Sequence, residues 1–314
     1  MGAPGCSIDG DGCVYAYRRN HGGKDNWGSY DRILGPYGSD LGSRLAVDGY
    51  TAAVGGGVQV YMLSLGANYY TFARTAAPRE VSDSGGLGYS VALYGDLLAA
   101  GAPDEASGYG AAYIFKRDQH APNSWTLLRR IFAADGVLGD RFGASISLSG
   151  NWLAVGAVKA TTFEPGFVYL FERDTGGAEA WGQFKKLTCP DANCAFGYKV
   201  ALAGNTLAVG APTRPAVFLY YKDQGGTNAW GLKNRIDSAY WYFGWDLALD
   251  GDALIVGAPD ADVDSVSDQG AAYIFGRNQG GTDNWGQVKK LTAADGTNCA
   301  ADCAVRVSMP QSWP

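Results

Sequence analysis

The sequence is poor in the residues and motifs on which most catalytic functions depend. It contains only two histidines, His21 and His120, and both lie in expected loops. It has no Gly-x-Ser-x-Gly, His-Glu-x-x-His or phosphate-binding glycine-rich motif, so the usual hydrolase and nucleotide-binding signatures are absent. No apolar run approaches the roughly 18 residues that a membrane-spanning helix needs, and there is no Asn-x-Ser/Thr glycosylation sequon. We therefore expect a non-catalytic protein without cofactors, except for the calcium ion considered below.

The charge balance disfavours nucleic acid as a partner. The chain has 25 Lys and Arg against 31 Asp and Glu, a net charge of −6, whereas nucleic-acid-binding proteins present basic surfaces. A glycosidase with two carboxylates from distant parts of the chain is a weaker alternative, because no pair stands out among the acidic residues. Hydrophobic residues make up 46% of the chain, which is enough for a large core.

One pattern recurs along the whole chain: Phe-Gly or Leu-Gly, an alternating apolar stretch with a tight turn, and then Gly-Ala-Pro. The clearest copies begin at Leu87, Phe196 and Phe243, and drifted copies begin at Leu41 and Phe142. The glycine that opens Gly-Ala-Pro or its equivalent recurs at Gly2, Gly55, Gly101, Gly156, Gly210 and Gly257. This period of about 50 residues is typical of propeller blades.

Each copy predicts four β-strands. Alternation broken by Asp-Gly, Ser-Gly or Ala-Gly indicates a first hairpin, as around Asp250-Gly251. A third strand follows in segments such as Ala271–Arg277, and a glycine-rich turn leads through a tryptophan to a fourth. Four-stranded units in a radial array form a β-propeller.

Six repeats account for the chain, with approximate boundaries 37–86, 87–141, 142–195, 196–242, 243–302 and a split repeat of 303–314 with 1–36. Gly2-Ala3-Pro4 lacks a preceding strand, and Ala304–Met309 has the alternating pattern of that strand. We predict an all-β fold in one domain, 1–314. It is a six-bladed β-propeller of four-stranded antiparallel blades, with the ring closed by N- and C-terminal strands.

The six cysteines form three local pairs, Cys6/Cys13, Cys189/Cys194 and Cys299/Cys303. Their even number and loop positions favour three small disulfides and an oxidising compartment, while reduced thiols in a cytosolic protein are the alternative. Cys303 could also pair with Cys6 or Cys13 across the ring closure.

The repeat resembles the FG-GAP family, which includes integrin α-subunit propellers and surface proteins of microbes and protists. The resemblance is carried by Phe-Gly at 142, 196 and 243 and by Gly-Ala-Pro at 101, 210 and 257. The Gly-Gly-x-x-x-Trp-Gly turn is similar to the microbial and protist branch. The resemblance implies an extracellular scaffold for adhesion or ligand binding, usually without catalytic activity. Integrin propellers usually have seven blades, so six departs from that pattern.

Calcium is the metal that the resemblance raises. Integrin-like repeats bind it in an Asp-rich loop between the first two strands, where this chain has only tight turns. A different loop carries Asp260, Asp262, Asp264 and Asp268, whose alternating carboxylates could converge on one Ca²⁺ ion. Ser265 stands where a calcium loop prefers glycine, and a solvated acidic loop is the alternative.

Two groups of aromatic residues differ in what they predict. Trp27, Trp125, Trp181, Trp230 and Trp285 recur at one point of the repeat, which indicates packing between blades. The segment Tyr240–Trp245 occurs once, and its Tyr240, Trp241, Tyr242 and Trp245 are candidates for stacking on a sugar or another ligand. The alternative is an aromatic core at a blade interface.

Two non-enzymatic functions fit these features. The first is an extracellular adhesion or ligand-binding module, whose partner at the cell surface is a protein or a glycan. Its contact surface is expected at Tyr240–Trp245 and in the loops Asp104–Gly110, Lys159–Gly166 and Asp260–Gly270, where the repeats differ. The second is a repeating subunit of an extracellular filament or coat, in which Ala304–Met309 completes the open blade of the next molecule.

Overall fold

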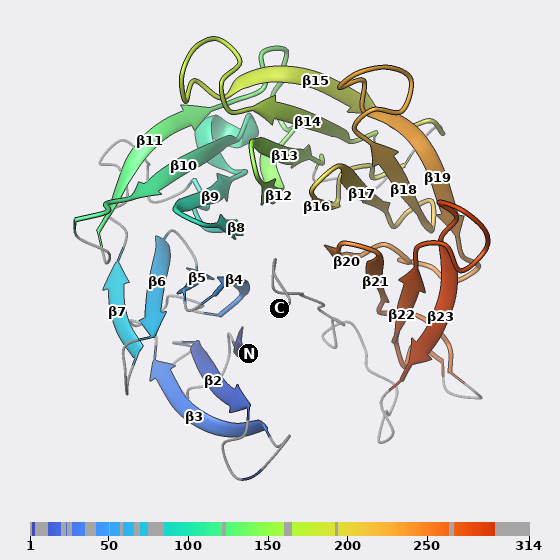
Figure 1. Ribbon diagram of the computed structural model, residues 1–314, viewed down its shortest axis with the longest axis horizontal. Coiled ribbons are helices and arrows are strands. Elements are labelled where there is room, and N and C mark those ends of the chain that lie inside the picture. The colour runs from blue at the N-terminus through green and yellow to red at the C-terminus, as the bar shows by residue number, and fades with distance from the viewer. Residues whose placement is uncertain are drawn as a thin grey trace. The chain divides into compact units, whose positions relative to one another are not determined.

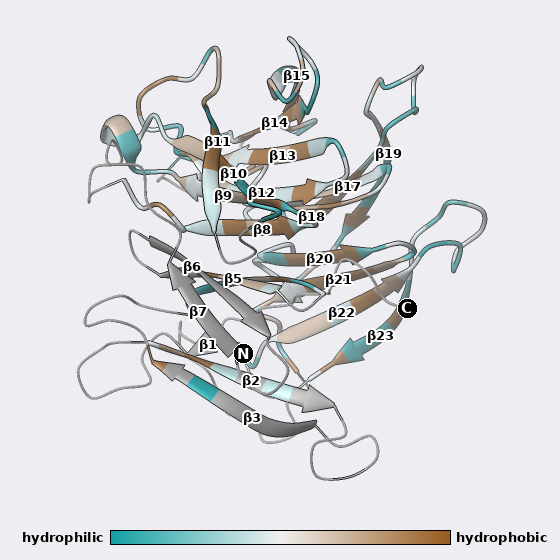
Figure 2. Ribbon diagram, turned by 60° about the vertical axis from the view of Figure 1, so that its left-hand side comes forward, coloured by the Kyte–Doolittle hydropathy of each residue, from teal (hydrophilic) through white to brown (hydrophobic). Residues whose placement is uncertain are grey.

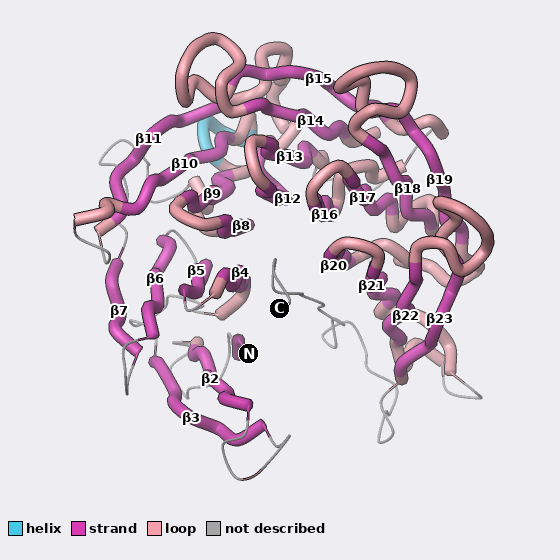
Figure 3. The backbone as a smooth tube through the Cα atoms, in the orientation of Figure 1, coloured by secondary structure: helices cyan, strands magenta, loops and turns pink. Residues whose placement is uncertain are grey.

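The computed structural model describes residues 2–3, 12–19, 23, 27–34, 42–49, 51–56, 59–65, 70–74, 85–120, 124–159, 165–191, 194–263 and 267–292. The chain divides into two compact units, Met1–Gly143 and Ala144–Pro314. The only helical element in the described ranges is a 3₁₀ turn, η1 (Glu105–Gly108) (Figure 3). No helix in these ranges is long and apolar enough to cross a membrane.

Three antiparallel sheets form the first unit, each with its strands in chain order (Figure 1). Sheet 1 contains β1 (Gly2–Ala3), β2 (Cys13–Arg19) and β3 (Trp27–Leu34). Sheet 2 contains β4 (Arg44–Asp48), β5 (Thr51–Gly56), β6 (Gln59–Leu65) and β7 (Tyr70–Arg74). Sheet 3 contains β8 (Ser90–Tyr94), β9 (Leu97–Ala102), β10 (Ala111–Arg117) and β11 (Trp125–Ile131).

The second unit repeats this plan in three four-stranded sheets. Sheet 4 contains β12 (Phe142–Ser149), β13 (Trp152–Ala157), β14 (Phe167–Glu172) and β15 (Gly182–Thr188). Sheet 5 contains β16 (Lys199–Ala203), β17 (Thr206–Ala211), β18 (Ala216–Tyr221) and β19 (Gly231–Asp237). Sheet 6 contains β20 (Asp246–Asp250), β21 (Ala253–Ala258), β22 (Ala271–Gly276) and β23 (Gly286–Leu291).

The hydrophobic core lies between consecutive sheets. Along β17, Leu207 and Val209 belong to a cluster shared with sheet 4, while the intervening Ala208 belongs to a cluster shared with sheet 6. Side chains alternate across a strand, so a middle strand such as β17 is buried on both faces. In the second unit the middle strands are accordingly apolar and the loops at their ends hydrophilic (Figure 2).

The paired Phe-Gly and Gly-Ala-Pro motifs join one sheet to the next. In sheet 5, Gly197 donates its N–H to the carbonyl of Gly210, the glycine of Gly-Ala-Pro in the same sheet. Gly210 in turn faces the following sheet so closely that a Cβ there would lie 2.1 Å from the carbonyl oxygen of Gly244. Equivalent close approaches join Gly55 to Gly88, Gly101 to Gly143 and Gly156 to Gly197. The glycines are therefore required where the backbones of neighbouring sheets meet.

Serine side chains join the first strands of sheets 4 and 5. The hydroxyls of Ser145, Ser147 and Ser149 on β12 accept hydrogen bonds of 2.9 to 3.0 Å from the backbone N–H groups of Val200, Leu202 and Gly204. β16 is the edge of its sheet, and a buried backbone N–H without a partner is costly. The three serines therefore satisfy donors that no strand pairs.

The third and fourth strands carry a bulge at one repeated position. The register between β18 and β19 shifts at Leu219/Tyr220. Equivalent shifts occur at Ala16/Tyr17, Ile114/Phe115, Leu170/Phe171 and Ile274/Phe275. In sheet 6, Val288 is the extra residue on the outer strand, since Lys289 and Gln287 oppose consecutive residues.

The prediction of four-stranded antiparallel units is confirmed for sheets 2 to 6. Sheet 1 has three strands among the described residues. The strand predicted at Ala304–Met309 lies outside the described residues, so closure of the ring by the two ends of the chain stays a prediction.

Candidate functional site

Two of the recurrent tryptophans, Trp230 and Trp285, contact the preceding sheet, as predicted. Trp230 of sheet 5 lies edge-on against Trp152 of sheet 4, with ring centroids 5.2 Å apart. Trp285 of sheet 6 donates its indole N–H to the hydroxyl of Tyr221 in sheet 5, at 2.9 Å. These residues therefore belong to the joints between repeats.

An arginine reinforces the joint at equivalent positions of two repeats. Arg117 of sheet 3 donates to the Thr51 hydroxyl of sheet 2 at 2.7 Å. Arg277 of sheet 6 donates to the Thr206 hydroxyl of sheet 5 at 3.3 Å. In both cases the threonine opens the second strand of the preceding sheet. Sequence inspection did not identify these arginines, although aligning the repeats places them in one column.

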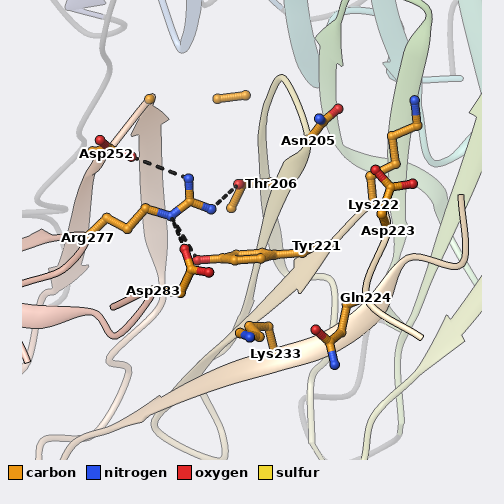
Figure 4. A pocket seen from close by; sticks show the side chains of 12 residues that line it. Asn205, Thr206, Tyr221, Lys222, Asp223, Gln224, Lys233, Asp252, Arg277 and Asp283 are labelled. Carbon is orange, nitrogen blue, oxygen red and sulfur yellow. Dashed lines mark hydrogen bonds and ion pairs between the residues drawn. The ribbon is translucent and has the colours of Figure 1, made fainter. Parts of the chain in front are cut away.

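A cavity of about 340 Å³ surrounds Arg277 at the joint of sheets 5 and 6 (Figure 4). Its charged lining residues are Lys222, Lys233, Arg277, Asp223, Asp252 and Asp283. The Arg277 guanidinium contacts Tyr221 Oη at 3.1 Å, Asp252 Oδ1 at 3.4 Å and Asp283 Oδ1 at 3.3 Å. Burial alone would lower the pKa of Arg277, but these three partners together raise it. The central cation of the cavity is therefore already engaged in holding the two sheets together.

A carboxylate of the acidic loop of sheet 6 accepts a hydrogen bond from the backbone of the same loop. The Asp262 carboxylate accepts the backbone N–H of Asp268 at 3.0 Å. Burial and the nearby charge of Asp268 raise the pKa of Asp260. Asp264 lies outside the described residues, and among those described no three His, Cys, Asp or Glu residues are grouped to hold a metal. The Ca²⁺ site at Asp260, Asp262, Asp264 and Asp268 stays a prediction.

The four aromatic candidates divide into two kinds. Tyr240 stacks on Tyr273 at 6.2 Å between ring centroids and packs against the core of sheet 6. Trp241 is 62% exposed. Tyr242 meets Trp245 edge-on at 5.2 Å. The structure thus leaves Trp241, Tyr242 and Trp245 as candidates for ligand contact.

A further aromatic residue, Tyr198, completes this group. Its ring lies 4.4 Å from that of Trp245, between centroids, and both rings are half-buried. We call Tyr198, Tyr242 and Trp245 the aromatic cluster. Tyr198 was missed from the sequence, although it occupies the same repeat position as Trp245, directly after Phe-Gly.

The position after Phe-Gly or Leu-Gly carries information about function. It holds Tyr89, Tyr198 and Trp245 in three repeats but the small residues Ser43 and Ala144 in two others. Because repeats with a small residue form the same kind of sheet, folding does not require an aromatic ring at this position.

The loop predicted at Asp104–Gly110 is anchored by a buried carboxylate. Glu105 is 5% exposed and accepts the Tyr113 hydroxyl at 2.7 Å. It also pairs with Arg130. Burial, and then Glu105, raise the pKa of Tyr113. Glu105 is therefore a structural anchor of η1. Parts of the other two variable loops, 160–164 and 264–266, lie outside the described residues.

One of the three predicted disulfides is seen directly. Cys189 and Cys194 are bonded, with their Cα atoms 6.5 Å apart. Cys13 is also disulfide-bonded, to a cysteine beyond the described ranges. Cys6, Cys299 and Cys303 lie outside the described residues.

Three segments of the chain, 125–171, 181–229 and 237–275, match the model of the FG-GAP repeat family. They cover the fourth strand of sheet 3, nearly all of sheet 4, and little more than the first three strands of sheets 5 and 6. The chain therefore contains FG-GAP repeats at these three positions. No curated protein matches it.

Solved structures share the fold at low sequence identity. A protein from Lactobacillus plantarum has a TM-score of 0.61 and 14% identity, over 93% of this chain and 81% of that chain. Sqt1 from Chaetomium thermophilum has a TM-score of 0.55 and 15% identity, over 95% of this chain and 69% of its own. Such likeness shows the fold alone, which is all-β and propeller-like.

Proposed function

We propose that this protein is a non-catalytic, extracellular binding module of the adhesion type. Its contact surface is the aromatic cluster together with the exposed Trp241, and its ligand is a glycan or a protein at the cell surface. The observation that carries the proposal is the aromatic ring after Phe-Gly, which some repeats have and folding does not require. Half-exposed tyrosine and tryptophan rings have apolar faces and a polar edge, so they can stack on sugar rings or anchor a protein interface.

The extracellular assignment draws on the cysteines. The Cys189–Cys194 bond and the bonded Cys13 are typical of secreted proteins, because cytosolic thiols are kept reduced. The non-catalytic assignment draws on the cavity, in which Arg277 already contacts Tyr221, Asp252 and Asp283. We further propose six blades, with Ala304–Met309 supplying the strand that sheet 1 lacks among its described residues.

Binding to an array of glycans and cell-surface proteins tests the main proposal. Trp245→Ala and Trp241→Ala are expected to weaken binding of the best ligand by about tenfold or more each, as truncation of an aromatic anchor does. Phe132→Ala is a matched control, since Phe132 is 63% exposed and lies in the other unit. Equal binding by all three variants would remove the aromatic cluster from the proposal. Robust turnover of a glycan or phosphoester by the purified chain would refute the non-catalytic assignment.

A filament subunit is the second candidate, and the three described strands of sheet 1 favour it as much as they favour closure within one chain. Deletion of Ala304–Pro314 separates the two. Loss of the folded monomer supports closure in cis, whereas a folded monomer that no longer self-associates in native mass spectrometry supports strand exchange.

A further inference from the structure

Arg44 in the first unit lies on an aromatic ring that a second arginine also covers. The guanidinium carbon of Arg44 is 5.1 Å from the centroid of the Tyr89 ring, and that of Arg141 is 5.3 Å from the same centroid. Tyr89 is itself 36% exposed. Stacking on a tyrosine holds a guanidinium in a fixed plane at little cost in side-chain entropy.

The two arginines differ in how their charges are satisfied. Arg141 forms an ion pair with Asp104 at 3.0 Å. Arg44 donates one hydrogen bond, to the Ser43 carbonyl at 2.8 Å, and has no ion pair with any carboxylate in the part of the chain that the structure describes. A half-buried guanidinium with unused N–H donors favours an oxyanion partner.

In the second unit, the basic residue at the same repeat position is paired with a carboxylate of the protein itself. Lys199, the counterpart of Arg44 in sheet 5, pairs with Asp246 of sheet 6 at 2.8 Å. The counterpart of Asp246 beside Arg44 is Ser90 of sheet 3. Ser90 is buried, and its hydroxyl donates to the Gly143 carbonyl at 2.7 Å. The carboxylate that completes the pair in one unit is thus replaced by a serine in the other.

We propose that Arg44, oriented by Tyr89, binds an oxyanion supplied by a ligand, namely a carboxylate or a sulfate. Arg44 donates to it through the edge of the guanidinium, whereas Arg141 stays paired with Asp104. This site lies in the first unit and does not depend on the aromatic cluster. The whole protein carries a charge of −6. Binding of an acidic ligand would therefore not result from the net charge of the protein.

Calorimetric titration with three oligosaccharides tests the proposal. The probes are a heparin tetrasaccharide, an oligogalacturonate that carries carboxylates alone, and neutral maltotetraose. Binding of the oligogalacturonate shows that a carboxylate is sufficient, and binding of heparin alone identifies sulfate as the source. Affinity should fall with added salt, because the contact is electrostatic. No binding of either acidic probe, or equal binding of maltotetraose, overturns the proposal.

Variants locate the site. Arg44→Gln should weaken binding of the acidic probe by about tenfold or more, the usual effect of removing a hydrogen bond to a charged group. Arg129→Gln removes the same charge from an exposed position of β11 and should leave affinity unchanged. If the two variants behave alike, Arg44 is not the site.

Two further variants keep the test independent of folding. Arg44→Lys retains the charge but loses the planar fork, so a partial loss of affinity is expected. Ser90→Asp supplies the internal carboxylate found at Asp246 and should abolish binding by occupying Arg44. Unchanged affinity in both, with cooperative thermal unfolding retained, contradicts the proposal.

Discussion

Replacing Gly210 by alanine tests whether the Gly-Ala-Pro glycine is required by the close approach of neighbouring sheets. Gly210 lies within β17, where alanine is ordinarily preferred over glycine by roughly 0.5–1 kcal/mol because glycine loses more backbone entropy on folding. The close approach predicts instead that alanine at this position destabilises the fold. A Cβ at Gly210 would lie 2.1 Å from the Gly244 carbonyl oxygen, whereas ordinary van der Waals contact begins at 3.4 Å.

The conflict cannot be relieved by rotating a side chain, because the obstructing atom belongs to the backbone. The segment around Gly244, just before β20, must move away by roughly 1 Å, which disturbs the close-packed core between sheets 5 and 6. Overpacking of this kind costs about 1–3 kcal/mol. We therefore expect Gly210→Ala to lower the free energy of unfolding by about 2 kcal/mol, measured by urea denaturation.

A second glycine separates the close approach from backbone strain. Gly204 has φ +54° and no atom within 4 Å of a Cβ, so Gly204→Ala should cost about 1 kcal/mol from its left-handed conformation alone. If Gly210→Ala is neutral or more stable than the parent, the explanation of the Gly-Ala-Pro motif is wrong.

Four further predictions concern individual contacts. Ser147→Ala leaves the Leu202 N–H without its partner and should cost about 1–3 kcal/mol of unfolding free energy. An unchanged urea midpoint would contradict the role given to the serine hydroxyls of β12. Burial raises the pKa of Tyr273 to about 12 from 10.0. The buried, protonated phenol therefore contributes fully to the free energy of unfolding below pH 10, and this contribution is lost as pH rises through about 12. Tyr273→Phe should therefore lessen alkaline destabilisation, and a parent-like alkaline transition would refute this. Calcium should raise the melting temperature of the parent but not of Asp262→Ala, since a cation bound by the folded state stabilises it; no shift in the parent removes the Ca²⁺ site. Peptide mapping of unreduced protein should recover Cys189 linked to Cys194, and free thiols at both would overturn the extracellular assignment.

The repeat could be predicted from the sequence because its signals are local. Asp250-Gly251 and its counterparts mark the first hairpin, and Gly251 adopts the positive φ of 52° that such a turn needs. The alternation of apolar residues in β20 and β22 then predicts which side chains of each strand are buried.

The contacts between sheets could not be predicted in the same way, because they join residues about 50 positions apart. Ser147 and Leu202, or Lys199 and Asp246, are ordinary residues until the fold brings them together. The same holds for Tyr198, whose role depends on Trp245 in the next sheet. Alignment of the repeats is the sequence signal that could have identified them, since a residue that varies at a fixed position is not required for folding.

The bulge repeated on the fourth strands bears on how molecules of this protein can associate. A fourth strand is the outer edge of its sheet, and a regular edge invites another strand to add through its free backbone groups. The shift at Leu219/Tyr220 and its counterparts breaks that regular row in the middle. The exposed Lys289 beside the bulge of sheet 6 adds a charge that an incoming strand would have to bury. Growth by edge-to-edge strand addition at these outer edges is thereby disfavoured.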